Sequence, residues 1–328
     1  MPGQTDAPAG PPDAYSLANF GEIMFPCLEA ISAESVIEVG AYRGDFTREL
    51  LAWAERAGAE VTAIEPEPPP QLLELAEGHP ELKLVREESH RALATIPLAD
   101  AVIIDGDHNY YTLSEELRLI EERAGEGNLP LLLFHDVCWP HARRDTYYAP
   151  ERIPEERRQP LARDATIAPG EPGLADAGLE YPWAAEREGG PANGVLTAIE
   201  DFIAGKDELR LAVVPTFFGL GILWSERAPW ADRVAGIVDP WDSSPMLRRL
   251  EADRVDHIVD RVRLRRQERL LRSLLDSRAF AGIARKIRRR RRLKQSNLGK
   301  EGTKPPALPT AGSDSVSDPA ARSPTPSA

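Results

Sequence analysis

The sequence predicts an α/β fold in which five parallel strands and an antiparallel hairpin form a doubly wound sheet with helices on both faces. Two observations predict it. Between residues 35 and 134, short apolar runs alternate with stretches whose apolar side chains recur at helical spacing. The runs 101–104 and 131–134 are wholly apolar, which is typical of parallel strands covered on both faces. A helical, basic extension is expected to follow toward the C-terminus.

The first half of the chain predicts a regular alternation of elements. A helix is expected over 17–31, where apolar residues recur at helical spacing. The proline run 66–70 interrupts the chain and starts a helix that extends through Ala76. The other elements are expected as strands at 35–39, 60–64, 82–85, 101–104 and 131–134, and as helices at 45–56, 89–94 and 112–123.

The stretch 138–192 shows no regular pattern and carries several Tyr and Trp residues among many Arg and Pro. A loop of this length inside a compact domain is often a lid over an active site, and the alternative is a surface insertion without a role. Asn193 is expected to cap a helix over 194–204. The strands expected at 209–214 and 220–224 are joined by a short connection and should pair antiparallel.

Composition divides the chain into further parts. Its 328 residues suit one large domain or two smaller ones. Both ends are rich in Pro, Ser, Gly and Ala, which is typical of disorder. An apolar stripe predicts a helix over 247–275. The expected parts are a disordered 1–13, a main domain 14–226 with the insertion 138–192, a connector 227–246, a helical basic extension 247–294 and a disordered tail 295–328.

Charge is distributed unevenly along the chain. The net charge is −13, yet the segment 254–294 carries 16 Lys and Arg against four Asp and Glu, which leaves the remainder strongly acidic. The acidic body is not expected to bind nucleic acid non-specifically. The segment 283–294 suits an anionic membrane surface or another polyanion such as nucleic acid. The alternative is a solvated helix end without a partner.

Several classes of protein are excluded by composition. Two cysteines, Cys27 and Cys138, are too few for a disulfide framework or a cysteine-based zinc site. We therefore expect a reduced, cytoplasmic compartment, with peripheral membrane attachment through the basic extension as a further option. No apolar run reaches the roughly 18 residues of a membrane span. The first twelve residues lack the basic and apolar regions of a signal peptide.

Glycines and acids mark the ends of the first two strands. Glu38, Gly40 and Gly44 lie where the first strand turns into a helix, and Glu65 ends the second strand. Tyr42 replaces the central glycine of a dinucleotide fingerprint, which disfavours a dehydrogenase. Glu38 can accept a hydrogen bond from a cationic amine, and Glu65 can accept from both hydroxyls of a ribose. The alternatives are a turn that simply needs glycine and an ordinary exposed glutamate.

Acids and histidines follow the fourth and fifth strands. Asp105, Asp107 and His108 come after the fourth strand, and His135 and Asp136 come after the fifth. Such oxygen ligands suit Mg²⁺, Mn²⁺ or Ca²⁺, and the same groups are candidate bases. If the two strands are neighbours, the carboxylates of Asp105 and Asp136 meet and repel each other unless a cation or a shared proton lies between them.

Each of these residues also has a structural interpretation. Asp107 can serve the N-terminus of the following helix, and His135 can simply pack in the core. His90 and His141 are interpreted as surface or loop histidines.

Together these motifs resemble a class I S-adenosylmethionine-dependent methyltransferase. They are Glu-x-Gly-x-x-x-Gly, an acid that ends the second strand, Ile-Asp-Gly-Asp-His with an aromatic residue two places later, and a strand that ends in His-Asp. Within that superfamily the chain is similar to the group of macrocin and related sugar O-methyltransferases, which the segments 193–195 and 214–221 also resemble. The resemblance covers about residues 15–225 and implies a Rossmann-like methyltransferase domain.

The resemblance implies residues for the cofactor S-adenosylmethionine. Gly40 and Gly44 would face its methionine part, with Glu38 near the amino group. Glu65 would hold the ribose hydroxyls. Glu88-Ser89 would lie around the adenine. Asp105 is also counted among the cofactor-binding residues.

The resemblance also implies a metal and a base. Asp105 and Asp136 would bind a divalent metal such as Mg²⁺ or Mn²⁺, with His135 where relatives often have a second Asp. Asp107 matches the position of the general base, and His108 is the other candidate. A metal that binds a hydroxyl lowers its pKa so that the base can take the proton.

The expected function is therefore metal-assisted O-methylation of a sugar or small-molecule hydroxyl, with the insertion closing over the acceptor. One alternative is a metal-independent methyltransferase that acts on nitrogen or on RNA. The sequence after the fourth strand lacks the Asn/Asp-Pro-Pro-Tyr/Phe of enzymes that methylate base amino groups. Another alternative is a non-catalytic binding or scaffold protein that docks through its basic extension. The partner is expected to be a small molecule or glycan, and an oligomer is compatible with the sequence.

Overall fold

The structure, a computed structural model, describes residues 15–125 and 127–276. The chain divides into two units, residues 1–266 and residues 267–328, and of the second unit only 267–276 are described. The expected disordered ends 1–13 and 295–328 and the basic segment 283–294 lie outside the described residues. None of the helices in the described residues combines the length and the apolar character that a membrane crossing requires.

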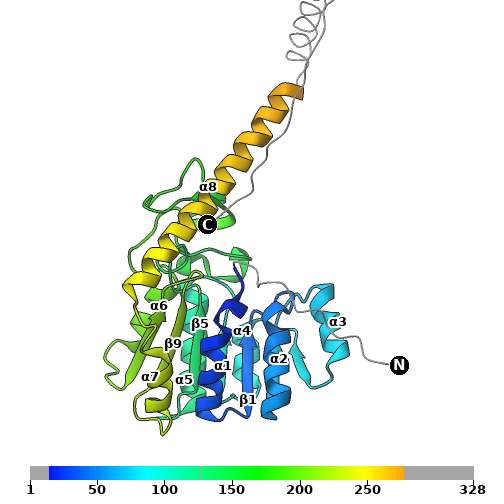
Figure 1. The fold of residues 1–328 in the computed structure, drawn as a ribbon, viewed down its shortest axis with the longest axis vertical. Coiled ribbons are helices and arrows are strands. Elements are labelled where there is room, and N and C mark those ends of the chain that lie inside the picture. Colours follow the sequence, from blue (N-terminus) through cyan, green and yellow to red (C-terminus); the bar gives the residue numbers. More distant parts are fainter. Residues whose placement is uncertain (1–14, 126, 277–328) are drawn as a thin grey trace, which may run out of the picture. The chain divides into compact units, whose positions relative to one another are not determined.

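A seven-stranded sheet organises the first unit (Figure 1). Its spatial order is β3-β2-β1-β4-β5-β9-β8, with parallel pairing from β3 to β5 and antiparallel pairing of β9 with both β5 and β8. This confirms the predicted five parallel strands and hairpin. The strands are β1 (Ser35–Val39), β2 (Glu60–Ile64), β3 (Leu82–Val85), β4 (Ala101–Ile104), β5 (Leu131–His135), β8 (Leu209–Val214) and β9 (Leu220–Ser225).

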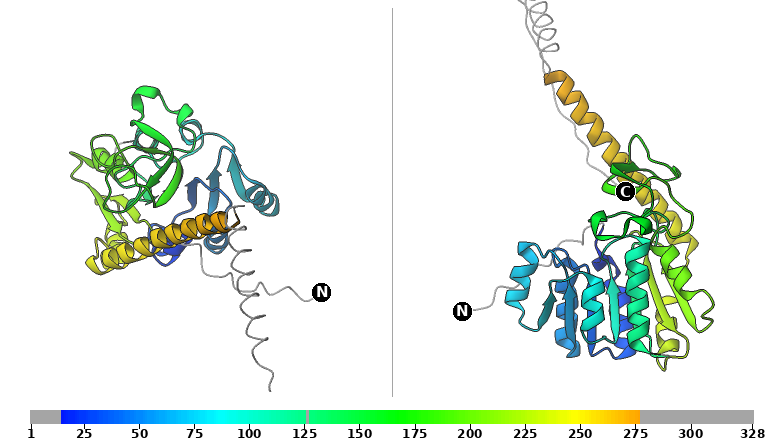
Figure 2. Two further views of the ribbon diagram at one scale, coloured as in Figure 1. Left: turned by 90° about the horizontal axis from the view of Figure 1, so that it is seen from above. Right: turned by 180° about the vertical axis from the view of Figure 1, so that it is seen from behind.

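Helices cover both faces of this sheet (Figures 1 and 2). Buried side chains of α1, α2 and α7 form the core on one face, and those of α4, α5 and α6 form the core on the other. The helices are η1 (Leu17–Phe20), α1 (Gly21–Ile31), α2 (Asp45–Ala57), α3 (Pro70–Gly78), α4 (Ser89–Thr95), α5 (Tyr110–Ala124), α6 (Val195–Ile203), α7 (Ala231–Val238) and α8 (Pro245–Asp276).

The insertion 138–192 is more regular than predicted. It contains two 3-10 turns, η2 (Pro150–Arg152) and η3 (Glu155–Arg157), and an antiparallel pair of strands, β6 (Leu161–Ile167) and β7 (Leu179–Ala185). The apolar–polar alternation of these strands is broken by charged residues and by Pro182, which a two-stranded ribbon tolerates because both strands are edges. The connector expected at 227–246 likewise contains α7.

Asp145 fixes the base of the insertion to the main domain. Its Oδ1 accepts hydrogen bonds from the backbone N–H of Tyr110, 2.8 Å away at the start of α5, and of Gly194, 2.6 Å away at the start of α6. Its Oδ2 accepts from the hydroxyl of Tyr147 at 2.9 Å. One buried carboxylate therefore joins three segments.

Asn193 does not cap α6 as predicted. Its Oδ1 accepts a hydrogen bond from the backbone N–H of Asp145 at 2.8 Å, and its Nδ2 donates to carbonyls of the insertion. The N-cap of α6 is Gly194, with φ of 92°. Asn193 thus stabilises the base of the insertion rather than the end of the helix.

Candidate active site

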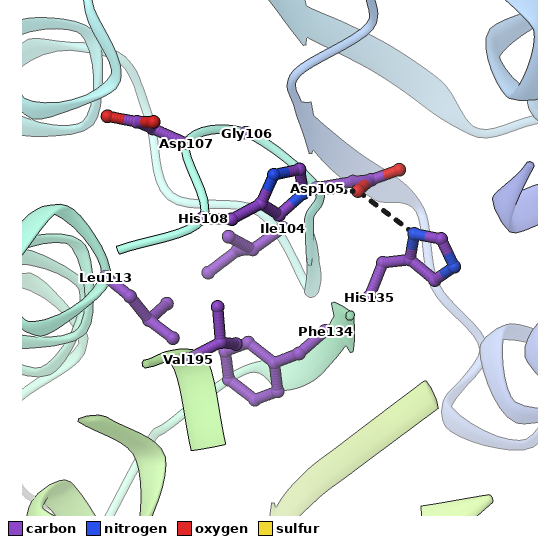
Figure 3. A pocket seen from close by; sticks show the side chains of 9 residues that line it. All are labelled: Ile104, Asp105, Gly106, Asp107, His108, Leu113, Phe134, His135 and Val195. Atoms are coloured by element: carbon purple, nitrogen blue, oxygen red, sulfur yellow. Dashed lines mark hydrogen bonds and ion pairs between the residues drawn. The ribbon is translucent and has the colours of Figure 1, made fainter. Parts of the chain in front are cut away.

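The candidate residues converge at the carboxyl ends of β1, β2, β4 and β5. The parallel register places Ile104 beside Phe134, so the segments that follow β4 and β5 leave the sheet side by side. A small pocket opens there (Figure 3), lined by Ile104, Asp105, Gly106, Asp107, His108, Leu113, Phe134, His135 and Val195.

Two carboxylates and two imidazoles meet in this place, as the strand order predicted. Nδ1 of His135 lies 3.1 Å from Oδ1 of Asp105 and 3.6 Å from Oδ2 of Asp136. Nε2 of His108 lies 2.7 Å from Oδ2 of Asp136 and 3.5 Å from Oδ1 of Asp105. Figure 3 shows His108 and His135 on opposite sides of the Asp105 side chain. The structure therefore brings together four of the five acids and histidines that follow β4 and β5.

The hydrogen bonds of His135 fix which nitrogen faces the acids. Its Nε2 lies 3.0 Å from the carbonyl oxygen of Phe217, which can only accept, so Nε2 carries a proton and donates it. Its Nδ1 faces the carboxylate of Asp105 with either a second proton or a lone pair. A lone pair that faced a carboxylate alone would be repelled. The arrangement therefore needs a second proton on the imidazole, a proton on the carboxylate, or a cation bound between them.

Electrostatics favours the second proton on the imidazole in the metal-free protein. Burial lowers the pKa of His135, but the charges of Asp136 and Asp105 outweigh it and raise this pKa to about 9. Burial likewise lowers the pKa of His108, and Asp136 and other neighbours bring it well above its usual value. Burial raises the pKa of Asp136, and the charges of His135 and His108 more than reverse the effect, so this pKa falls below its usual range. These shifts favour the protonated form of both imidazoles and the ionised form of both carboxylates when no cation is bound.

The donor set also fits a divalent metal. Within the described residues, ligand atoms of Asp105, His135 and Asp136 lie within 4.8 Å of one another, and so do those of His108, Asp136 and His141. The first group is the set that the resemblance implied. Both groups share Asp136 and combine carboxylate oxygen with imidazole nitrogen, which are ligands of Mn²⁺, Fe²⁺ and Zn²⁺ sites.

His141 is a candidate that the sequence interpretation missed. It is buried rather than a surface histidine, its ring stacks on that of His108 with centroids 4.4 Å apart, and Nδ1 lies 3.1 Å from the hydroxyl of Thr146. Burial lowers the pKa of His141 to about 3. Its only sequence signal is its place five residues after Asp136, which does not show that the chain folds back over the site.

Asp107 is turned away from this cluster (Figure 3). Its Oδ2 accepts a hydrogen bond from Nδ2 of Asn109 at 2.6 Å, and its Oδ1 accepts from the backbone N–H of Tyr148 at 3.3 Å. The N-cap of α5 is Asn109, whose Oδ1 accepts from the N–H of Thr112 at 2.8 Å. Asp107 therefore supports the capping residue instead of capping the helix itself. Burial raises the pKa of Asp107.

Gly40 and Gly44 are required by the backbone itself. Gly40 has φ of 89°, and a Cβ there would lie 2.1 Å from the backbone oxygen of Asp105. Gly44 has φ of 77° and is the N-cap of α2. The turn after β1 thus approaches the turn after β4 too closely for any side chain. Both glycines have a structural role whether or not they also face a ligand.

The acids at the ends of β1 and β2 are suited to a ligand with donors. Glu38 is 3% exposed, and its Oε2 has no hydrogen-bond partner among the described residues. Burial raises the pKa of Glu38 to about 8. The two oxygens of Glu65 accept from the N–H groups of Tyr42, at 3.0 Å, and of Glu67, at 3.2 Å, which holds the carboxylate at the sheet edge. An orphaned buried carboxylate and an anchored one fit the amine and ribose of S-adenosylmethionine.

Glu88 and Ser89 lie at the start of α4. Glu88 and Arg152 of the insertion line a pocket of about 200 Å³. Nε of Arg152 lies 3.5 Å from the carboxylate of Glu88. Ser89 lies beside Glu116, whose pKa is raised to about 8 by burial and lowered in part by the Ser89 hydroxyl. The pocket is lined by Pro66, Glu67, Arg86, Glu87, Glu88, Arg91 and Arg152.

Residues 37–137 match a family model described as a methyltransferase domain. Over these residues the chain is similar to a methyltransferase domain. The matched segment runs from β1 to just after β5 and includes the glycine turn, Glu65 and the acids and histidines that follow β4 and β5. No curated protein matches the chain.

Solved structures of methyltransferases are also similar to this chain. The methyltransferase PaMTH1 of Podospora anserina, bound to SAH, has 15% identity and a TM-score of 0.39 over 66% of this chain and 89% of that chain. An O-methyltransferase family protein of Burkholderia thailandensis has 13% identity and a TM-score of 0.37 over 64% and 56%. Human N-acetylserotonin methyltransferase in complex with SAM has 11% identity and a TM-score of 0.34 over 63% and 51%.

Proposed function

We propose that this protein is a methyltransferase that transfers the methyl group of S-adenosylmethionine to a hydroxyl of a sugar or small molecule, with a divalent metal held by Asp105, His135 and Asp136. The observation that carries the proposal is the convergence of these three residues and His108 at the carboxyl ends of β4 and β5. The sugar class, and a relation to the macrocin group, rest on the sequence resemblance alone.

The cofactor supplies a methyl group on a sulfonium, which is displaced in line by the attacking oxygen. The chain contributes alignment. Glu38 would receive the amino group on its unpartnered Oε2, and the positive charge would favour the ionised form of this buried acid. Glu65, already oriented by Tyr42 and Glu67, keeps lone pairs for the two ribose hydroxyls.

A divalent metal in this place lowers the pKa of a hydroxyl bound to it. His108 is the residue positioned to take the hydroxyl proton, once the charge of a bound cation has displaced the proton that the carboxylates favour on its ring. Its Nε2 lies 2.7 Å from Oδ2 of Asp136 and 3.5 Å from Oδ1 of Asp105, at the edge of the proposed metal site. Asp107 would first have to give up its hydrogen bonds with Asn109 and Tyr148 to reach the same place. We therefore assign the base to His108.

The insertion supplies aromatic surface beside the base. Tyr148 is 73% exposed, and its ring centroid lies 5.8 Å from that of His108. A flat exposed ring next to the reacting hydroxyl suits the apolar face of a sugar or an aromatic acceptor. Tyr181 lies behind His141, with ring centroids 5.4 Å apart.

A metal-independent methyltransferase is the second candidate. It is favoured by the distance of 2.7 Å between Nε2 of His108 and Oδ2 of Asp136, because a protonated imidazole there neutralises the carboxylate without a metal. The two candidates differ in what Asp105 contributes, since only the first needs it as a ligand.

Calorimetry with S-adenosylmethionine, with and without Mn²⁺ or Mg²⁺, tests the proposal. The wild-type protein should bind the cofactor, and Glu65→Ala should weaken this binding. A separate metal signal should disappear in Asp105→Ala. Cofactor binding without a metal signal would favour the second candidate, and no cofactor binding at all would refute both. A panel of sugar and phenolic acceptors, followed by mass spectrometry for a gain of one methyl group, then identifies the acceptor class.

A further inference from the structure

His135 gives the proposed metal site a buried nitrogen ligand between two carboxylates. We infer that the site selects a first-row transition ion such as Mn²⁺, Fe²⁺, Co²⁺ or Zn²⁺ over Mg²⁺, and that His135 is the residue that determines this selectivity. The inference rests on the metal site of the proposed function and goes further by naming the class of ion. It depends on how firmly His135 is held and on what an imidazole prefers to bind.

His135 is held in the orientation of a metal ligand. Its side chain is 2% exposed, and Phe20 packs edge-on against its ring with centroids 6.0 Å apart. The bond from Nε2 to the carbonyl of Phe217 leaves Nδ1 as the nitrogen that faces both carboxylates. Metal-binding histidines usually donate their other N–H to a carbonyl or carboxylate in this way, which fixes tautomer and ring plane.

The carbonyl of Phe217 is itself fixed by α8. Phe217 and Phe218 both have positive φ, 46° and 67°, and their consecutive N–H groups donate to the carboxylate of Glu251 at 2.9 and 2.7 Å. Arg254 pairs with Glu251 at 2.7 Å, and its guanidinium lies over both phenyl rings. Two residues in a conformation that side chains disfavour persist only when their surroundings hold them. The position of the carbonyl that orients His135 is therefore specified by several contacts.

The donors available favour transition ions. Mg²⁺ prefers six oxygen ligands in near-ideal octahedral geometry and keeps several waters. Imidazole favours transition ions, for which affinity generally rises from Mn²⁺ toward Cu²⁺. The second group of ligand atoms adds the imidazoles of His108 and His141 around the shared Asp136. Apart from Asp105 and Asp136, all members of the two groups are therefore histidines, which offer nitrogen.

Metal titration of the full-length protein tests the inference without an activity assay. The protein is stripped with a chelator, and Mg²⁺, Mn²⁺, Co²⁺ and Zn²⁺ are titrated separately by calorimetry. Co²⁺ is also followed by its visible spectrum, which responds to nitrogen ligation. We expect Co²⁺ and Zn²⁺ to bind at least about tenfold more tightly than Mg²⁺. His135→Asp should reduce the Co²⁺ to Mg²⁺ affinity ratio at least about tenfold and shift the Co²⁺ spectrum. His79→Gln changes a partly exposed histidine at the end of α3, is the matched control and should change neither.

Three results would overturn the inference. The first is a wild-type protein that binds Mg²⁺ as tightly as Co²⁺ or binds no metal. The second is an unchanged affinity ratio in folded His135→Asp. The third is a ratio that depends on His141→Gln and not on His135, which would place the ion at the other group of ligands. If His135→Asp does not fold, the Co²⁺ to Mg²⁺ affinity ratios of His135→Gln and of the wild type are compared instead. Cofactor binding is measured in parallel, so that loss of the proposed function and loss of metal selectivity appear as separate outcomes.

Discussion

Glu38→Gln removes a buried acid whose protonation makes the stability of this protein depend on pH. Burial raises the pKa of Glu38 from its ordinary 4.5 to about 8, so the folded protein holds this proton at pH values where the unfolded chain has released it. The stability contributed is present in full below pH 4.5 and is lost as pH rises through 8. At about 1.4 kcal/mol for each pKa unit, the difference amounts to on the order of 5 kcal/mol.

Urea unfolding at pH 5, 6.5 and 8 and constant ionic strength measures this effect. The free energy of unfolding of the wild type should fall between pH 5 and 8 relative to that of Glu38→Gln, because glutamine has no proton to release. Glu55→Gln, on the exposed side of α2, is the control and should follow the wild type. Wild-type and Glu38→Gln curves that stay parallel from pH 5 to 8 would refute the reasoning.

Three further predictions concern the backbone, the base and α8. Gly40→Ala should lower the free energy of unfolding by more than about 3 kcal/mol or prevent folding, because the new Cβ would collide with the backbone. The control Gly58→Ala, whose Cβ meets nothing within 4 Å, should lower it by about 1–2 kcal/mol. Thermal unfolding compares the two variants. His108→Gln should lower kcat by a factor of about 10² or more with cofactor affinity retained, as steady-state kinetics and calorimetry would show; an unchanged kcat would return the role of base to Asp107. Glu251→Gln breaks a largely buried ion pair and should destabilise the protein by about 3 kcal/mol while weakening metal binding, and a stability loss without any change in metal affinity would contradict its link to His135.

The sheet and the meeting of Asp105 with Asp136 were predictable from the sequence because both follow from strand order. Wholly apolar runs predict β4 and β5. Because the two strands are parallel neighbours, the residues that follow them lie at the same edge of the sheet. The sequence also placed His135 beside these acids. It could not show which nitrogen faces them, because that depends on the carbonyl of Phe217, some eighty residues away.

The parts that sequence reasoning missed depend on competition or on distance. Asp107 was expected to serve chemistry or a helix end. Its chemical role stays a prediction, whereas α5 is capped by Asn109, which also donates a hydrogen bond to the Asp107 carboxylate. His141 reaches the site only because the chain turns back after β5. Arg163 and Asp164 interrupt the alternation of β6 and Pro182 interrupts β7, so the sequence pattern did not predict these strands.

The hydrogen bonds of Asp145 restrict where the insertion can hinge. The same carboxylate accepts from the first N–H of α5 and from the N–H that precedes α6. A rotation that began before residue 146 would therefore break hydrogen bonds at the N-termini of two helices at once. The backbone N–H of Thr146 also donates to the carbonyl of His108 at 2.9 Å. Any opening that admits an acceptor must therefore bend the chain beyond Thr146. The segment up to Thr146, which lies next to the proposed base, is therefore expected to keep its position when an acceptor enters.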